Sequence, residues 1–420
     1  MAGGLMQLVA YGAQDVYLTG NPEVTFFQAK YKRHTNFAME NIEQTVNGTA
    51  ANSGRVSVTV ARNGDLVGDM YLELESAIAT TATHEDGDCN WVAERAISSV
   101  ELSIGGQRID KHYQKWWRLY SELYLDEAKK ASWGKMTTAA DTGAGTGAVY
   151  LPLIFFFNRN PGLYLPLIAL QYHEVRIDID LASDFTTFLN ASVLKVWANY
   201  VYLDTEERRR FAQKGHEYLI EQVQHTGTDT VDESTTKQVR LSYNHPVKEL
   251  VWCFSNTAAK SSLWNFTAKN LVTEVALQSD QTSNGLDANC FVPISNLGTP
   301  MYATKLSTEA FTEENAGQLE TFKLVLNGQD RFKEQKGKYF NQVQSYNHHS
   351  GCPAPGVYSY SFALKPEEHQ PTGTCNFSRI DNAQVAIKMG AGKALSMHMF
   401  ATNYNVLRIQ SGMGGLAFSN

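Results

Sequence analysis

The sequence predicts an all-β protein built from two tandem β-sandwiches. Segments in which apolar and polar residues alternate dominate the chain, helical periodicity is rare, and one strand-and-turn pattern occurs twice. A period of two puts apolar side chains on one face of a strand, as in an antiparallel sheet with one wet face. The jelly roll, with eight strands in two sheets, is the natural candidate for each sandwich, although the pattern alone does not choose the strand connectivity.

The strand segments support this prediction in chain order. Segment 55–76 predicts a β-hairpin with Asn63-Gly64 in a tight turn. Segment 100–109 predicts a second hairpin around Gly105-Gly106. Segment 174–181 alternates most regularly, with Val, Ile, Ile and Leu on one face and Glu, Arg, Asp and Asp on the other.

One segment has helical periodicity. In residues 111–130, apolar side chains recur at i, i+3, i+4 and i+7, which predicts an amphipathic helix with a single apolar stripe formed by Trp116, Leu119, Tyr120 and Leu123. Because the segment lies between predicted strands, we expect an insertion packed on the end of a sheet. The Gly- and Thr-rich stretches 137–148 and 277–290 are expected to be surface loops.

An internal duplication explains the length of the chain. At 420 residues the chain exceeds the roughly 250–300 residues at which a single core stops growing. The sequence LSIGGQRI beginning at Leu102 resembles LVLNGQDRF beginning at Leu324, and in both halves an aromatic strand, a Pro-bearing loop and an alternating strand follow. We therefore predict an arm at 1–24, a first jelly roll at 25–205, a charged linker at 206–216 and a second jelly roll at 217–420.

Composition and charge exclude several classes of protein. The net charge of −7 opposes a direct nucleic-acid-binding role, because phosphate binding requires a concentrated positive field. The N-terminus lacks the basic region of a secretion signal, and the most apolar stretch, 149–157, is too short to span a membrane. The five cysteines are far apart and form no CxxC, so we expect reduced, mostly buried thiols.

Several small motifs are better explained by structure than by chemistry. Asp178 and Asp180 could form a carboxylate pair, but a row of charges on a strand is usually its solvated face. His348-His349 is interpreted as part of a loop, and the glycines of segment 411–418 as bends in a C-terminal strand. The run 208–210 of three arginines is interpreted as a solvated turn. We predict no catalytic, cofactor-binding or metal-binding residue, and no cofactor.

Four Asn-x-Ser/Thr sequences are potential glycosylation sites. We treat Asn47, Asn190 and Asn265 as possible acceptors, and expect the fourth, Asn376, to be buried.

Long blocks of the chain resemble the major capsid proteins of nucleocytoplasmic large DNA viruses, with the algal, chlorovirus-like members most similar. The blocks are residues 5–40, 104–113, 151–175, 326–332, 360–383 and 403–418, and they occur in family order. Loops 77–92, 132–148 and 255–315 match nothing in this pattern.

The resemblance implies a double jelly roll that forms homotrimers, which tile an icosahedral shell over an internal viral membrane. It implies self-association, minor capsid proteins as partners, and a location in the virion after assembly in the infected cell. It also places the arm at the inner side of the shell, with Leu5, Leu8, Val9 and Tyr11 as apolar anchors and Asn21-Pro22 as the turn into the first strand. The alternative function is a secreted tandem β-sandwich that binds or cleaves carbohydrate, motivated by the aromatic strands and the carboxylate pair.

Overall fold

The chain falls into two compact units, residues 1–36 and 37–420. The computed structural model describes residues 3–76, 91–138, 147–231, 236–255, 292–294, 301–303, 318–390 and 395–418. Among these, no helix is both long and apolar enough to cross a membrane.

The first unit is a short, exposed arm. It contains two helices, α1 (Gly3–Val9) and α2 (Val16–Thr19), and none of their residues is buried. Asn21 follows with a left-handed backbone at φ 50°. The first strand, β1 (Phe37–Gln44), begins only sixteen residues after Asn21, so the expectation that Asn21-Pro22 turns directly into it is wrong. Residues 23–36, which belong to no helix or strand, separate the bend from the strand.

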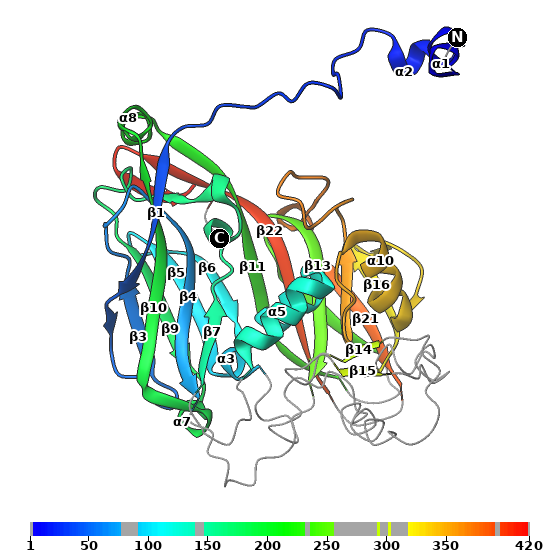
Figure 1. Ribbon diagram of the computed structural model, residues 1–420. Helices are drawn as coiled ribbons and strands as arrows, with labels where there is room; N and C mark the ends of the chain where they lie inside the picture. The colour runs from blue at the N-terminus through cyan, green and yellow to red at the C-terminus, as the bar shows by residue number, and fades with distance from the viewer. Residues whose placement is uncertain are drawn as a thin grey trace, which may run out of the picture. The chain divides into compact units, whose positions relative to one another are not determined.

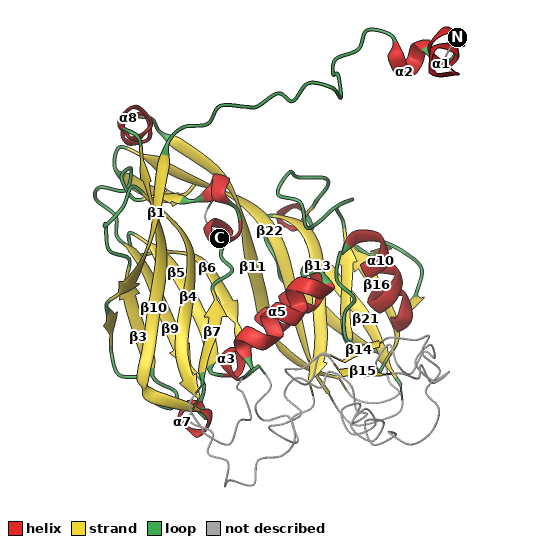
Figure 2. Ribbon diagram, in the orientation of Figure 1, coloured by secondary structure: helices red, strands yellow, loops and turns green. Residues whose placement is uncertain are grey.

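Two antiparallel sheets form the first sandwich (Figures 1 and 2). We call them sheet 1, with strand order β1-β10-β4-β7 and β8 paired with β4, and sheet 2, with order β2-β3-β9-β5-β6. The remaining strands of sheet 1 are β10 (Leu189–Leu203), β4 (Leu66–Ser76), β7 (Ala148–Pro152) and β8 (Leu165–Pro166). Those of sheet 2 are β2 (Val46–Asn47), β3 (Arg55–Thr59), β9 (Val175–Leu181), β5 (Ile97–Ile104) and β6 (Gln107–Tyr113).

The second sandwich repeats this order. Sheet 3 has the order β11-β22-β13-β19, with β20 on β13 and β23 on β22, and sheet 4 has β12-β21-β16-β17, with β18 on β16. Sheet 3 contains β11 (His216–Val231), β22 (Leu395–Gln410), β13 (Pro246–Ser255), β19 (Val357–Ser361), β20 (Cys375–Asn376) and β23 (Met413–Leu416). Sheet 4 contains β12 (Lys237–Leu241), β21 (Ala383–Met389), β16 (Leu319–Leu326), β17 (Gln329–Asp330) and β18 (Gln335–Lys336). A separate pair joins β14 (Val292–Ile294) to β15 (Met301–Ala303).

The duplicated sequence pattern marks equivalent hairpins. Gly105 and Gly106 turn β5 into β6 with φ of 57° and 83°, and Asn327 and Gly328 turn β16 into β17 with φ of 50° and 81°. Each hairpin then pairs with an alternating strand, β9 in sheet 2 and β21 in sheet 4. The predicted duplication and the second hairpin are confirmed.

The predicted hairpin over 55–76 is wrong. β3 pairs with β9 in sheet 2, whereas β4 pairs with β10 in sheet 1, so the segment crosses from one sheet to the other. Gly64 does not have a positive φ. A Cβ there would lie 2.9 Å from Cβ of Tyr200, so close packing accounts for the glycine. The alternation of apolar and polar residues predicts two strands, but it does not predict which strands they pair with.

Helices fill the junction between the sandwiches. They are α3 (Val92–Arg95), α4 (Gln114–Leu123), α5 (Glu127–Thr137) and α6 (Phe156–Arg159), and Figure 1 shows α5 running from beside β7 towards β13. The helix predicted in 111–130 is confirmed as α4, but the single apolar stripe is wrong. Trp117, Arg118 and Glu122 are buried along with the predicted stripe residues Trp116 and Leu119. Other elements cover the far side of α4, and ion pairs engage its Arg118 and Glu122.

The other short helices connect strands. They are η1 (Pro161–Leu163), α7 (Phe185–Phe188), α8 (Thr205–Gln213), η5 (Tyr339–Val343), α10 (Gln344–His348) and η6 (Phe377–Arg379). One buried apolar cluster includes Val251, Val357 and Phe400 from sheet 3 together with the core of the first sandwich. One face of sheet 3 therefore packs on the core of the first sandwich, while the interior of the second sandwich forms a separate apolar cluster.

Candidate assembly surfaces and the junction between the sandwiches

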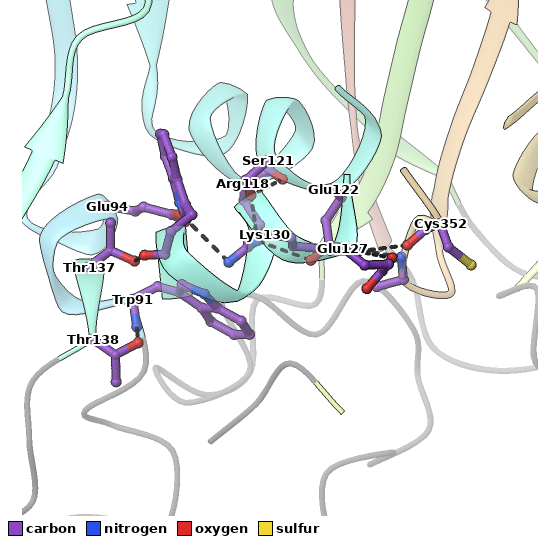
Figure 3. A network of polar contacts seen from close by, with 12 residues as sticks. Trp91, Glu94, Arg118, Ser121, Glu122, Glu127, Lys130, Thr137, Thr138 and Cys352 are labelled. Atoms are coloured by element: carbon purple, nitrogen blue, oxygen red, sulfur yellow. Dashed lines mark hydrogen bonds and ion pairs between the residues drawn. The ribbon is translucent and has the colours of Figure 1, made fainter. Parts of the chain in front are cut away.

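A buried network of ion pairs joins helices α3, α4 and α5 of the first sandwich (Figure 3). Arg118 of α4 lies between two carboxylates, with Nη1 3.6 Å from Oε1 of Glu94 and Nη2 3.1 Å from Oε1 of Glu122. Lys130 of α5 has its Nζ 2.7 Å from Oε2 of Glu122 and also donates to the carbonyl oxygen of Cys352 at 2.7 Å. That carbonyl belongs to the second sandwich, so the network joins the two halves.

Burial and charge act in opposite directions on these carboxyls. Burial by itself raises the pKa of Glu122, but Lys130 and Arg118 outweigh it and lower that pKa. Burial dominates at Glu94, whose pKa is raised even though Trp133 donates to its Oε1 at 2.5 Å. Glu122 is thus held as an anion between two cations, and such a charge is costly to leave unpaired.

A second network crosses the junction at Glu221 of β11. Its Oε1 lies 2.7 Å from Nζ of Lys248, and its Oε2 accepts from Nη2 of Arg159 at 2.9 Å. Burial alone raises the pKa of Glu221, but Lys248 and Arg159 together lower it. Lys248, which also donates to the carbonyl oxygen of Pro366 at 2.7 Å, has its pKa lowered by burial. Arg159 comes from α6 of the first sandwich, so this ion triad spans both halves.

A backbone carbonyl and a side-chain carboxylate of β6 extend the contact along β11. Gln222 donates through Nε2 to the carbonyl oxygen of Ile109, and the amide of Val223 donates to Oδ1 of Asp110 at 3.0 Å. The first sandwich thereby covers part of the free edge of β11, a pairing edge of the kind that β-proteins usually protect.

His349 forms a third buried charge site, at the end of α10. Its Nε2 lies 3.1 Å from Oε2 of Glu249 and its Nδ1 3.4 Å from Oε1 of Glu367. Burial alone lowers the pKa of His349, but Glu249 outweighs it and raises the pKa to about 9. The interpretation of His348-His349 as a loop is wrong for His348, which ends α10 and whose Nδ1 contacts the carbonyl oxygen of Leu364 at 3.0 Å, and holds for His349, which follows the helix.

His398 of β22 forms a contrasting site beside α4. Its Nε2 lies 3.0 Å from Nζ of Lys115 and 3.0 Å from Oγ of Ser255. Burial, then Lys115, then His225 lower the pKa of His398 to about 3. This imidazole is therefore neutral in the folded chain at physiological pH.

The other sequence candidates have structural roles. Asp178 lies 3.2 Å from Nη2 of Arg55 and accepts from Nε of Arg176 at 2.8 Å, while Asp180 accepts from Ser99 at 2.8 Å. Both carboxylates are thus engaged on the charged face of β9, but Asp178 is buried and Asp180 half-buried, so the interpretation of this face as solvated is wrong for Asp178.

Of the predictions for the two ends of the second sandwich, the turn at 208–210 is wrong and the bent C-terminal strand is confirmed. The run 208–210 lies in the exposed helix α8, not in a turn, and Nε of Arg208 is 3.0 Å from Oδ1 of Asp65. The C-terminal glycines form the predicted bent strand: Ser411 and Gly412 reverse the chain, and β23 pairs back on β22. In the part of the chain that the structure describes, no group of three or more His, Cys, Asp or Glu side chains could hold a metal ion.

The cysteines are only partly as expected. Cys253 is buried, and burial raises the pKa of its thiol to about 12. Cys375 is half-buried and Cys352 is exposed, so the expectation of mostly buried thiols holds for Cys253 alone among the described cysteines. All three are free thiols.

The predicted arm anchors are exposed in the first unit. The exposed fractions are 55% for Leu5, 77% for Leu8, 76% for Val9 and 58% for Tyr11. Such a cluster of exposed large apolar side chains indicates an interaction surface.

The predicted glycosylation sites differ in access. Asn47 is exposed on β2, whereas Asn190 is half-buried and donates through its amide to Glu75 at 3.2 Å. Asn265 lies outside the described residues. Asn376 is exposed, so the expectation that it is buried is wrong; its Oδ1 caps η6 by accepting from the amide of Ser378 at 3.0 Å.

The sequence did not predict the charged junction. One local signal was present: Arg118 and Glu122 lie four residues apart on the otherwise apolar helix α4, where an ion pair can form along one face. Their partners from other elements, Glu94 and Lys130, carry no such signal in the sequence.

Comparisons with known proteins agree with this architecture. Residues 25–204 match the family described as major capsid protein N-terminus, and residues 207–415 match the family described as large eukaryotic DNA virus major capsid protein. The chain is 43% identical over 460 residues to the major capsid protein of Paramecium bursaria Chlorella virus 1 and 43% identical over 455 residues to that of Pyramimonas orientalis virus. Each alignment covers 100% of both proteins.

Solved structures show the same fold. The structure of PBCV-1 VP54 is 38% identical, with a TM-score of 0.79 over 94% of this chain and 100% of that one. The Faustovirus major capsid protein, at 12% identity, still has a TM-score of 0.70 over 97% of this chain and 96% of that one, which shows a shared fold. With its double jelly roll and full-length relatives, the chain belongs to the family of large eukaryotic DNA virus major capsid proteins, the structural proteins of the virion's capsid shell.

Proposed function

We propose that the chain forms a homotrimer with a nearly hexagonal outline, and that these trimers tile the icosahedral shell of a large double-stranded DNA virus. The observation that carries this proposal is the fusion of two similarly ordered sandwiches into one body. Three such chains contain six sandwiches, so an object with threefold symmetry can present six similar sides to its neighbours.

The junction networks support a rigid building block. Glu122 and Glu221 each contact cations at 2.7 Å and connect elements from both halves. Removing one partner of a buried ion pair is costly, which disfavours sliding of one sandwich on the other. A fixed angle between the sandwiches lets many weak contacts between trimers add up in a lattice.

The arm would act at the inner side of the shell. Its exposed apolar side chains, including Leu8 and Val9, need a cover that the isolated arm does not supply. In this proposal they anchor neighbouring chains or minor capsid proteins, close to an internal viral membrane, and Asn21-Pro22 bends the arm. Among the sequence motifs for glycans, exposed Asn47 is the better acceptor, whereas the amide of Asn190 is already bonded.

The first experiment measures the native particle. Light scattering of the purified chain should give three times the chain mass of 46.8 kDa, and electron microscopy should show a hexagonal outline. A monomer at capsid-like concentrations would overturn the trimer. The carbohydrate alternative gains no support from Asp178, whose carboxylate is held by two arginines; reducing-sugar release that is lost in Asp178→Asn would revive it.

A further inference from the structure

Sheets 1 and 3 occupy equivalent places in the two sandwiches, but they differ in how many of their faces are covered. In sheet 3, every residue of β13 from Val247 to Ser255 is buried. In sheet 1, β4 alternates from Met70 to Ser76, so that only every second residue is buried. Continuous burial indicates a strand covered on both faces, and alternation indicates one covered face.

The first sandwich supplies the second cover of sheet 3. Val251, Cys253 and Val357 are 0% exposed and Phe400 is 1% exposed, and all four belong to the apolar cluster of the first sandwich. Helix α4 makes the contact directly, with the ring of Trp116 centred 5.7 Å from that of Phe400.

Among the residues that the structure describes, none covers the matching positions of sheet 1 in this way. The strand orders of the two sheets place β4 where sheet 3 has β13, and β10 where it has β22. Tyr71 of β4 lies opposite Trp197 of β10, as Val251 lies opposite Phe400. Both Tyr71 and Trp197 are half-buried, whereas their counterparts are fully buried.

The neighbouring pair repeats the contrast. Glu73 lies opposite Tyr150 of β7, as Cys253 lies opposite Val357 of β19. Tyr150 packs edge-on against Tyr71 with ring centroids 5.9 Å apart. At the sheet edge, Met39 of β1 is 51% exposed. Sheet 1 thus presents an outer face on which Met39, Tyr71, Tyr150 and Trp197 lie among polar side chains, and the indole of Trp197 donates to Glu73 at 2.6 Å.

The second sandwich has an uncovered counterpart of α4. Helix α4 follows the hairpin β5–β6, and the helical segment η5–α10 follows the equivalent hairpin β16–β17 and β18. Helix α4 has most of its residues buried. The surface around η5–α10 instead exposes large apolar side chains: Val343 at 42%, Tyr346 at 88% and Leu364 at 74%.

The two uncovered surfaces also carry complementary charge. The sheet 1 side carries three acidic residues, Glu43, Asp69 and Glu73, and one basic residue, Lys195, whose Nζ lies 4.0 Å from Oε1 of Glu73. Segment 331–338, which leads into η5, contains four basic residues and one acidic residue. Opposite potentials favour docking and fix its orientation.

We infer that the outer face of sheet 1 is covered by the η5–α10 surface of a second copy of this chain, just as α4 covers sheet 3 within one chain. The inference rests on the proposed trimer and names its contact. The contact is heterologous, because it joins two different surfaces, and three such contacts close a ring. Each chain gives one surface to the copy before it and the other to the copy after it.

Two double variants separate the surfaces. The sheet variant carries Met39→Glu and Tyr71→Glu, and the helix variant carries Tyr346→Glu and Leu364→Glu. Each places carboxylates in an apolar contact on one surface only and leaves the other intact. All four side chains are exposed or half-buried in the single chain, so both variants should fold. The control, Arg176→Glu with Lys388→Glu, changes charge on β9 and β21, whose outer faces the junction does not use.

The masses of the variants decide the question. Each double variant alone should be a monomer, with its trimer dissociation constant raised at least a hundredfold, while the control stays trimeric. A mixture of the two should stop at a heterodimer of twice the chain mass, because only one of the two possible contacts is intact. The other contact would bring the carboxylates introduced in the sheet variant against those introduced in the helix variant.

The possible failures are distinguishable. If the unmodified chain is a monomer, the proposed function fails. If the unmodified chain is a trimer and both double variants remain trimers, the trimer stands and this contact is wrong. A mixture in which both variants stay monomeric would also overturn the contact, because a head-to-tail arrangement requires the complementary pair to join. Far-ultraviolet circular dichroism of each variant checks that the sheets are retained.

Discussion

Arg159 of the first sandwich donates to Glu221 of the second at 2.9 Å, and both side chains lie where the two sandwiches meet. On the surface of the same chain, Arg408 donates to Glu217 at the same distance of 2.9 Å. The two pairs have the same donor–acceptor distance, but the side chains of the second pair are more exposed. Comparing them therefore separates the effect of burial from that of charge.

Arg159→Ala should destabilise the body more than Arg408→Ala. Loss of Arg159 leaves the buried Glu221 with Lys248 alone, and because the Arg159 side chain is 26% exposed, the cost should fall below the about 3–5 kcal/mol of breaking a fully buried pair. The exposed pair is worth about 0–1 kcal/mol. Urea unfolding at a fixed protein concentration measures both. Equal losses would mean that the junction network does not hold the sandwiches together.

Alkaline pH should destabilise the chain through His349. Its folded-state pKa of about 9 lies above the ordinary 6.5, so its contribution is complete below pH 6.5 and is lost as the pH rises to about 9. The shift corresponds to roughly 3 kcal/mol. The unfolding midpoint should fall across this window, and His349→Gln should flatten that fall.

The neighbouring residue provides the control for that experiment. His348→Gln should leave the pH dependence in place, because its ring contacts a backbone carbonyl rather than a carboxylate. If His348→Gln flattened the profile as much as His349→Gln, the contact of His349 with Glu249 would not be the cause.

Acidic pH should destabilise the chain through His398. Its folded-state pKa of about 3 lies below 6.5, because burial, Lys115 and His225 all disfavour a positive charge on the His398 ring. For a histidine held neutral, the stabilisation is complete above pH 6.5 and is lost as the pH falls towards 3. His398→Asn should reduce the loss between these values, whereas His34→Asn in the exposed arm should not. Thermal unfolding at a series of pH values tests this.

Gly105→Ala should destabilise the chain more than Gly106→Ala. Both glycines have positive φ, so each alanine costs about 1–2 kcal/mol from its backbone alone. A Cβ at Gly105 would also lie 2.3 Å from Nδ1 of His173, which contacts the carbonyl oxygen of Gly414, whereas nothing lies within 4 Å of a Cβ at Gly106. Similar midpoints for the two variants would show that His173 moves aside without cost.

Deletion of residues 1–24 should leave folded trimers but impair shell formation. The body, residues 37–420, forms its compact unit without these residues, and the arm's apolar side chains are exposed. Trimer mass by light scattering and particle yield by electron microscopy give the two readouts. Normal particles from the truncated chain would contradict the assembly role of Leu5, Leu8, Val9 and Tyr11.

The sequence by itself determined the local and repeated features of this protein. Alternation in 174–181 depends only on which side chains avoid water, and it correctly predicted the buried face of β9. The Gly-Gly turn after Ile104 depends on backbone sterics within two residues, and it was also correct. The duplicated pattern, together with the family resemblance, was sufficient for the fold and the capsid function.

Only the tertiary structure decided which elements meet. Strands β3 and β4 are close in sequence but lie in different sheets, because hydrogen-bond partners are chosen by the whole sandwich rather than by the turn between them. Lys130 and Cys352 are joined across the junction although 222 residues separate them, and no local pattern encodes such a contact. Burial of charges depends on everything packed around them, so the ion networks and the difference between the outer faces of sheets 1 and 3 emerged only in three dimensions.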